Sequence, residues 1–450
     1  MEKFVVTGGK KLRGIVNVSG SKNVALKALV AACLTSDKVI VENIPHISDF
    51  YLMVEIIEEL GGQVLIKDHT AEIQMAKFIS SKILLEKAAS IRTSSMFLAP
   101  LLSRTGKAIV PNPGGCRIGA RPIDRVINGL KKMGVSISYD RDDGYFHAKV
   151  KNGSKDGKLK GVNYRFEKNT HTGTETLILA AVLAEGKTIL ENAAQEPEID
   201  ELIELLNKMG AKIKRIKPRV IEIQGVKSLH GVKFSISPDR NEIVTFAIAA
   251  IITKGDVFVK NGDSKNLKEF LEKLKEIGGG FEERKDGIRF YAKGNLKATD
   301  ITTSPYPGFM TDWQGPFAVL MTKSTGTSVL HETVYENRFG YVSELKKMGA
   351  NIELFNPIVP DPKNFYNFNS QDDNKDYKHA ARIKGPVNLH NAVLSISDLR
   401  AGATLVLGAL CAKGTSVIFG IEHLNRGYEK FAERLAKLGA NIKRISDENI

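Results

Sequence analysis

The sequence predicts an α/β protein made of six related units, which form two domains of three units each. The first observation is a helix-like segment that ends in a hydrophobic residue followed by glycine and that recurs about every 70 residues. The second is that every copy carries an apolar stretch and short β-rich runs. The third is length, because six such units exceed a single hydrophobic core. The closing pairs are Leu60-Gly61, Met133-Gly134, Met209-Gly210, Ile277-Gly278, Met348-Gly349 and Leu438-Gly439.

The apolar stretch of each unit is expected to form a buried helix. Its residues are apolar almost all round, and a helix without a polar face has to be enclosed by other elements. Strands and surface helices are therefore expected outside three such helices in each domain. Examples of the apolar stretch are Val24–Leu34, Thr176–Ala184, Ile243–Ile252 and Ala403–Ala412.

The second helix of each unit is expected to be amphipathic and to end at the closing glycine. Short strands are predicted between the two helices at residues 39–41, 189–190, 257–259 and 417–419. The last unit is longer than the others, which indicates an insertion. Apolar faces are marked by Leu267, Phe270, Leu271, Leu274 and Ile277, and by Tyr428, Phe431, Leu435 and Leu438.

Composition narrows the class of protein. Hydrophobic residues make up 42% of the chain, and the apolar runs of about ten residues are shorter than the roughly 18 that a membrane helix needs. Three cysteines and an N-terminus without an apolar stretch lead us to expect a cytoplasmic protein. We expect no metal and no cofactor, because no Cys/His cluster, Walker loop or dinucleotide fingerprint occurs. The net charge of +14 indicates an anionic partner, namely a phosphorylated substrate, nucleic acid or a membrane surface.

Charged residues stand at the predicted starts of the buried helices. Asp239, Asp312 and Asp398 are each interpreted as helix caps. The helix dipole disfavours basic residues at these positions, so they need another explanation. Free N–H groups at a helix start, together with a basic side chain, bind phosphate or carboxylate. We therefore predict a positive site for phosphorylated substrates between the two domains. The basic residues are Lys22, Arg92, Lys168, Arg240 and Arg400.

One cysteine differs from the other two. Cys33 and Cys411 lie inside apolar helices, whereas Cys116 lies in a Gly/Pro-rich loop between residues 111 and 122, next to Arg117 and near Arg121. Positive neighbours lower the pKa of a thiol and make it reactive. The loop is therefore a candidate active-site lid with a titratable tip, although an incidental exposed cysteine fits the sequence equally well.

At this loop the chain resembles the UDP-N-acetylglucosamine 1-carboxyvinyltransferase family. The resemblance covers nearly the whole chain and implies two inside-out α/β barrel domains with the active site in the interdomain cleft. It places one domain at residues 21–236 and the other at 1–20 plus 237–450, with an insertion at about 355–381. The motifs are Ser19–Asn23, Pro113–Pro122, Thr311–Gln314, Glu332–Phe339, Asp398–Ala401 and Asn425–Glu429.

The resemblance implies transfer of the enolpyruvyl group of phosphoenolpyruvate to the 3-hydroxyl of UDP-N-acetylglucosamine, the first committed step of peptidoglycan synthesis. Asp312 resembles the base, and Cys116 resembles the general acid that forms a pyruvate adduct and is the target of fosfomycin. Lys22, Arg121 and Arg426 are expected to hold the phosphate, and Arg338 and Arg400 the carboxylate. Expected acceptor contacts are Asn23, Arg92, Arg121, Pro122, Ile123, Asp124, Arg125, Lys168, Asn169, Thr170, His171, Asp312 and Val334.

Two departures from the family pattern keep alternatives open. His171 stands where an apolar residue is usual, which leaves an enolpyruvyl transferase with another acceptor as the second hypothesis. The insertion is polar and aromatic, and we interpret it as a solvated surface loop. A basic nucleic-acid-binding protein is the third hypothesis, weakened because few aromatic residues accompany the basic clusters. The sequence leaves the oligomeric state open, and we favour a monomer.

Overall fold

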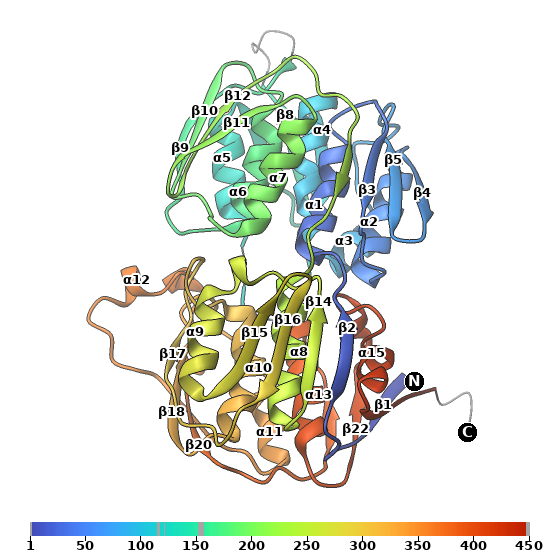
Figure 1. Cartoon of the computed structure of the whole chain (residues 1–450). Helices are drawn as coiled ribbons and strands as arrows, with labels where there is room; N and C mark the ends of the chain where they lie inside the picture. The colour runs from blue at the N-terminus through green and yellow to red at the C-terminus, as the bar shows by residue number, and fades with distance from the viewer. Residues whose placement is uncertain (1, 115–117, 121, 152–156, 447–450) are drawn as a thin grey trace. The chain divides into compact units, whose positions relative to one another are not determined.

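The computed structural model describes residues 2–114, 118–120, 122–151 and 157–446 (Figure 1). The chain forms two compact units, each with its own hydrophobic core. Unit 1 consists of Met1–Ser19, Cys116–Ala120 and Pro238–Ile450, and unit 2 consists of Gly20–Gly115 and Arg121–Ser237. Cys116 and Arg121 lie outside the described residues.

Unit 1 is built around three helices that pack against one another. They are α8 (Arg240–Ile252), α10 (Thr311–Thr322) and α13 (Leu399–Cys411). Every residue of α8 is buried, which confirms the expectation that apolar stretches form enclosed helices. Shorter helices lie outside them: α9 (Lys268–Ile277), α11 (Val342–Lys347), α14 (Glu422–Asn425) and α15 (Phe431–Lys437).

Three four-stranded sheets surround these helices, and all have the same topology (Figure 1). A parallel pair comes first, followed by two antiparallel pairings. The first sheet has the order β2 (Arg13–Asn17), β14 (Asp256–Lys260), β16 (Gly287–Ala292), β15 (Gly279–Arg284). The second has the order β17 (Ile301–Thr302), β18 (Gly326–His331), β20 (Ala380–Gly385), β19 (Asn351–Phe355). The third has the order β21 (Val393–Ser395), β22 (Thr415–Phe419), β1 (Glu2–Thr7), β23 (Asn441–Ser446).

Unit 2 repeats this plan. Its inner helices are α1 (Lys22–Ala32), η1 with α4 (Arg92–Phe97 and Leu98–Thr105) and α6 (His171–Ala181). Its outer helices are α2 (Ser48–Glu59), α3 (Leu85–Ser90), α5 (Asp124–Lys132) and α7 (Pro197–Lys208).

The three sheets of unit 2 follow the same order of strands. The first is β13 (Lys233–Ser235), β3 (Val39–Glu42), β5 (Thr70–Gln74), β4 (Gln63–Lys67). The second is β9 (Asn163–Arg165), β10 (Lys187–Glu191), β12 (Val220–Gln224), β11 (Lys212–Lys217). The third is β6 (Lys107–Pro111), β8 (Tyr145–Val150), β7 (Val135–Tyr139), where a single parallel bridge from Lys82 to Ile109 replaces the fourth strand.

The six closing glycines all have positive φ angles, as the ends of the outer helices require. The start of the last outer helix was predicted wrongly. Tyr428 lies in the loop between α14 and α15, because Lys430 adopts a left-handed conformation (φ 44°) and α15 begins only at Phe431. Leu267 likewise precedes α9 and is not part of it.

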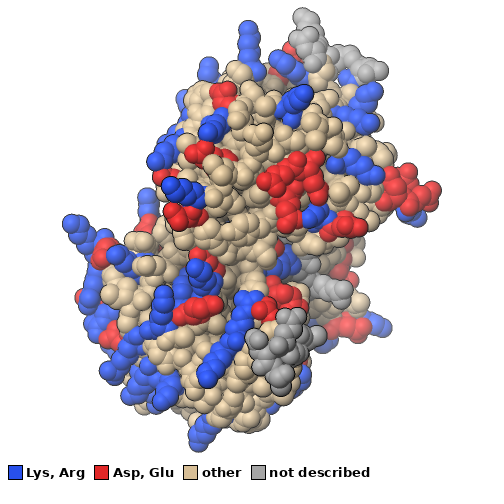
Figure 2. All heavy atoms as spheres, turned by 90° about the vertical axis from the view of Figure 1, so that its right-hand side faces the viewer, with Lys and Arg blue, Asp and Glu red and all other residues tan. Residues whose placement is uncertain are grey.

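Charges of both signs lie on the face of the protein that Figure 2 displays. Figure 2 shows Lys and Arg side chains interspersed with Asp and Glu over the face that it displays. That pattern differs from the unbroken basic surface typical of nucleic-acid-binding proteins. Among the described residues, no helix has the length and apolar character needed to cross a bilayer.

The insertion between β19 and β20 is partly buried, although the sequence led us to expect a solvated loop. It contains α12 (Pro362–Phe365) and η4 (Ser370–Asp372). Tyr366 and Phe368 are buried, and their rings contact His379; Tyr366 also contacts His331 of β18. The backbone N–H of Asn367 donates to the carbonyl of Thr333. The insertion is therefore packed onto the sheet of β18 and the loop that follows it.

This packing predicts acid sensitivity of unit 1. Burial, with a smaller contribution from His379, lowers the pKa of His331 from 6.5 to about 4. The unfolded chain then binds the proton more readily than the folded chain between pH 6.5 and about 4. The free energy of unfolding should fall by up to about 3 kcal/mol as the pH decreases through this window.

Urea unfolding followed by the fluorescence of Trp313, the single tryptophan, tests the expectation, since Trp313 is buried in unit 1. His331→Gln should flatten the pH dependence, whereas His390→Gln, at an exposed position in the same unit, should leave it unchanged. An equal pH dependence in His331→Gln and the unaltered protein would contradict the assignment.

Candidate active site

In unit 1, one carboxylate pairs with two buried arginines. Asp312, the second residue of α10, accepts from Nη2 of Arg338 at 2.9 Å and from Nε of Arg400 at 3.1 Å. Arg400 is the second residue of α13, and Arg338 lies in the loop between β18 and α11. The side chains of the two arginines are only 5% and 8% exposed. The structure thus brings together three residues that the sequence singled out for one site.

Both guanidinium groups are held in the charged state. Burial by itself lowers the pKa of Arg338, but Asp398 and Asp312 outweigh burial, so the pKa is raised. Burial also lowers the pKa of Arg400, and Tyr428 and Asp312 outweigh it in the same way. Two fixed cations with planar donor groups form a site suited to a carboxylate or phosphate.

The interpretation of the three aspartates as helix caps is right for two of them. Asp239 accepts from the backbone N–H groups of Asn241 and Glu242, at the start of α8. Asp398 caps α13 in the same manner. Asp312 is no cap, because it lies inside the first turn of α10, where its carboxylate binds the two arginines. Asp312 thus differs from Asp239 and Asp398 in that its carboxylate binds side chains of the candidate site and not the backbone at a helix start.

Sequence analysis missed Tyr428 as a partner of this site. Its hydroxyl lies 3.1 Å from Nη1 of Arg400 and 2.8 Å from Oγ1 of Thr245. Burial raises the pKa of Tyr428, so the group stays a neutral phenol beside the arginine. The sequence analysis placed Tyr428 on an apolar helix face because of its spacing from other apolar residues, and it therefore did not predict this polar contact.

Glu332 is the second residue that sequence analysis passed over, although it opens one of the motifs. It is buried and accepts from Oγ1 of Thr311 and from the backbone N–H groups of Val334 and Tyr335. These bonds tie the start of α10 to the loop that carries Val334. Burial raises the pKa of Glu332, and the hydrogen bonds oppose that effect.

Glu336 links the same loop to the described part of the cysteine loop. Its carboxylate accepts the backbone N–H of Ala120 within unit 1. At Gly119, which has a φ of 137°, a Cβ atom would lie 2.4 Å from this carboxylate, so only glycine permits the approach. Burial raises the pKa of Glu336. Arg426, the remaining predicted residue of unit 1, follows α14 and ends it.

Unit 2 holds the other predicted contacts, and the structure joins some of them. The guanidinium of Arg92 donates to the carbonyl of Pro122, so these two predicted residues lie together. Lys22, at the start of α1, pairs with Asp49 of α2 at 2.7 Å. Asn23, Ile123, Asp124 and Arg125 lie in or next to α1 and α5. Lys168, Asn169, Thr170 and His171 lead into α6, which Thr170 caps.

A buried ionic group lies beneath His171. Glu175, one turn further along α6, has no exposed side-chain surface. Its Oε1 atom lies 3.1 Å from Nε2 of His171 and 3.5 Å from Nζ of Lys27 in α1. Neither Lys27 nor Glu175 was singled out from the sequence. Lys27 is a polar interruption of the apolar stretch Val24–Leu34, and Glu175 directly precedes the stretch Thr176–Ala184.

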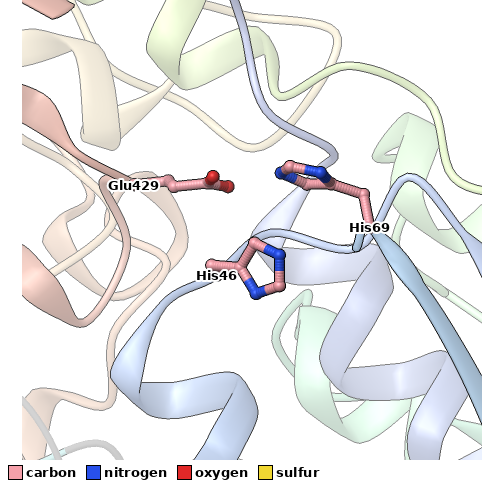
Figure 3. A group of neighbouring side chains, drawn as sticks. All are labelled: His46, His69 and Glu429. Atoms are coloured by element: carbon pink, nitrogen blue, oxygen red, sulfur yellow. The ribbon is translucent and has the colours of Figure 1, made fainter. Parts of the chain in front are cut away.

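Two further pairs of side chains in unit 2 are of the types that bind metal ions. His46 and His69 of unit 2 lie with their ring centroids 4.5 Å apart (Figure 3). Glu429, drawn in the same figure, belongs to unit 1. Asp143 and His147 pair at 2.8 Å on the exposed hairpin of β7 and β8, where both are 39% exposed.

Comparisons with known proteins agree with this architecture. The family model described as EPSP synthase (3-phosphoshikimate 1-carboxyvinyltransferase) matches residues 6–435. A Koribacter versatilis protein named UDP-N-acetylglucosamine 1-carboxyvinyltransferase is 42% identical, with 99% of this chain and 97% of that protein aligned. A Bartonella henselae protein of the same name is 40% identical, with 99% of this chain and 100% of that protein aligned.

Solved structures confirm the fold. The enolpyruvyl transferase NikO from Streptomyces tendae has a TM-score of 0.84 at 23% identity and covers 98% of both chains. EPSP synthase from Acinetobacter baumannii has a TM-score of 0.73 at 18% identity, over 99% of this chain and 100% of that one. At these identities the likeness concerns the fold alone.

The cysteines provide a prediction. Burial raises the pKa of Cys33 to about 12 and that of Cys411 to about 11. At pH 8 their thiolate fractions are roughly one in ten thousand and one in a thousand. Iodoacetamide at pH 8 should therefore label Cys116 at least about 100-fold faster than either, as peptide mass spectrometry would measure. Equal labelling of a Cys116→Ser variant and the unaltered protein would show that the reactive thiol lies elsewhere, and Cys33→Ala serves as the control.

Proposed function

This chain belongs to the EPSP synthase family, and we propose that it transfers the enolpyruvyl group of phosphoenolpyruvate to UDP-N-acetylglucosamine. Its curated relatives named UDP-N-acetylglucosamine 1-carboxyvinyltransferase are 40–42% identical over nearly its whole length. The reaction is the first committed step of peptidoglycan synthesis. We further propose a cytoplasmic location, which the free thiols of Cys33 and Cys411 support, since free thiols are typical of reducing compartments.

The chemistry is an addition followed by an elimination. A proton adds to the methylene carbon of phosphoenolpyruvate, and the sugar 3-hydroxyl oxygen bonds to the neighbouring carbon while it loses its proton. The tetrahedral adduct then loses a proton from the new methyl group, and the bond to phosphate breaks. Cys116 is proposed as the acid and Asp312 as the base. Phosphate leaves as an anion, which Lys22, Arg121 and Arg426 are proposed to hold.

The pairing of Asp312 with Arg338 and Arg400 is the observation that supports this proposal most directly. The two guanidinium groups are proposed to bind the substrate carboxylate, and in this structure the carboxylate of Asp312 is their partner. A substrate carboxylate would compete with Asp312 for the same donors. Asp312 would then be released from one or both arginines, and its basicity would rise as it loses positive neighbours. Binding of one substrate would thereby prepare the base for the other.

Transfer to a different acceptor is the second candidate function. His171 is the observation that favours it, because a polar ring at the start of α6 replaces the apolar residue that the family pattern usually has there. Phosphate release from phosphoenolpyruvate distinguishes the two candidates when measured with UDP-N-acetylglucosamine, UDP-glucose and shikimate 3-phosphate in parallel. We expect release with UDP-N-acetylglucosamine only. Release with another of the three acceptors alone would favour the second candidate. Absence of release with all three, from folded protein, would contradict the first candidate and would call for a wider screen of acceptors.

Replacement of the proposed base tests the role of Asp312. Asp312→Asn removes the proton acceptor and should lower kcat for phosphate release by about 100-fold or more. The matched control is Asp256→Asn, because Asp256 also pairs with an arginine of unit 1, Arg289, but at the protein surface. The control should keep nearly full activity. Nearly full activity in Asp312→Asn, with unfolding as cooperative as in the unaltered protein, would contradict the assignment.

A further inference from the structure

Glu175 belongs to a group of four ionisable side chains within unit 2, of which Glu175, Lys27 and Glu196 are buried and His171 is partly exposed. Oε1 of Glu175 is 3.1 Å from Nε2 of His171 and 3.5 Å from Nζ of Lys27. Among the described residues, neither oxygen atom of Glu175 has a hydrogen-bond donor, and the same is true of Oε2 of Glu196, the residue before α7. Within the described residues, the ion pairs with His171 and Lys27 therefore offset the negative charge of Glu175, a carboxylate that has no contact with water.

The balance of charge decides which form of His171 this group favours. Two carboxylates and one ammonium leave an excess negative charge in a region that water does not reach, and such an excess is costly. A protonated imidazole makes the four groups neutral together. Burial by itself lowers the pKa of His171, but Glu175 and, more weakly, Glu196 outweigh burial and the repulsion from Lys27. The pKa of His171 is consequently raised.

His171 is also the member of the group that a ligand can reach. Its side chain is 27% exposed, whereas those of Lys27 and Glu175 are 8% and 0% exposed. His171 is the first residue of α6, an eleven-residue helix whose N-terminus carries positive potential. Because Nε2 faces Glu175, the imidazolium has Nδ1–H left as a donor toward a ligand. A cation at the start of a helix favours an anionic group over a neutral base edge.

We propose that Glu175 is a positioning residue that holds His171 as an imidazolium, and that this cation binds the diphosphate of the nucleotide-sugar acceptor. The proposal rests on the proposed function, because it takes UDP-N-acetylglucosamine as the acceptor. Lys27 places a second positive charge on the same carboxylate and fixes its orientation between α1 and α6. The negative charge buried in the core thus determines the charge of a side chain at the surface.

The proposal predicts that acceptor affinity falls as the pH rises through the pKa of His171. Calorimetric titration of UDP-N-acetylglucosamine into the full-length protein, from about pH 6 to about pH 8.5, measures this directly. We expect Kd to rise about tenfold across the titration, because a charge-assisted contact with the diphosphate is lost. In Glu175→Gln the rise should occur about one pH unit lower or more, since the carboxylate no longer favours the imidazolium.

Matched variants separate this role from general loss of structure. Glu204→Gln removes an exposed carboxylate of α7 and should retain the pH dependence of the unaltered protein. In Glu175→Gln, KM for the acceptor should change, while kcat and KM for phosphoenolpyruvate stay within about twofold. A purely structural role would move all three constants together. That result, or an unchanged pH profile in Glu175→Gln, would overturn the proposal.

A measurement on the unaltered protein keeps the proposal testable if Glu175→Gln fails to fold. Nitrogen-15 NMR of histidine-labelled protein, with His171→Gln for assignment, gives the pKa of His171. A value above 6.5 supports the proposal, and a value at or below 6.5 overturns it. Acceptor binding that does not change with pH overturns this inference and leaves the proposed function intact. Absence of acceptor binding at every pH contradicts the proposed function and overturns the inference with it.

Discussion

The structure depends on the burial of helices that have no polar face. In each unit, three such helices pack against one another, and sheets and outer helices keep water from them. This arrangement is stable only because side chains around these helices are apolar on all sides, as in α8, where every residue is buried. In this arrangement, the polar groups at the helix starts have little contact with water. They therefore need hydrogen-bond or ion-pair partners within the protein.

Those partners are charges of opposite sign from neighbouring elements. At the starts of α10 and α13, Asp312 and Arg400 compensate each other, and Arg338 joins them from a loop. At the start of α6 and in α1, His171, Glu175 and Lys27 do the same in unit 2. Both groups pair acids with bases that are wholly or largely removed from water. In the proposed function a substrate group replaces Asp312 at the two arginines, whereas in the further inference His171 keeps Glu175 while it binds the acceptor. On these proposals, the same side chains serve stability and binding.

Loops complete the arrangement by tying residues to these helix starts. Glu332 joins the start of α10 to the backbone at Val334, and Glu336 holds the backbone of Ala120. The insertion is packed against the same region, because Asn367 bonds to the carbonyl of Thr333 and the backbone of Glu332 donates to the carbonyl of His379. A segment that looks like a solvated excursion by composition therefore supports the loop that carries Arg338.

The sequence by itself determined the α/β class, the six units, the enclosed helices and the closing glycines, because each depends on local periodicity or on the backbone conformation of one residue. Through the family resemblance it also assigned Asp312, Arg338 and Arg400 to one site. Only the tertiary structure decided that the carboxylate of Asp312 bonds to both arginines, since Arg338 and Arg400 lie 26 and 88 residues from Asp312 along the chain. Tyr428 was missed because its spacing among apolar residues resembles a core position, and Glu175 because it directly precedes the apolar stretch Thr176–Ala184. Only packing in three dimensions reveals the charge beside each.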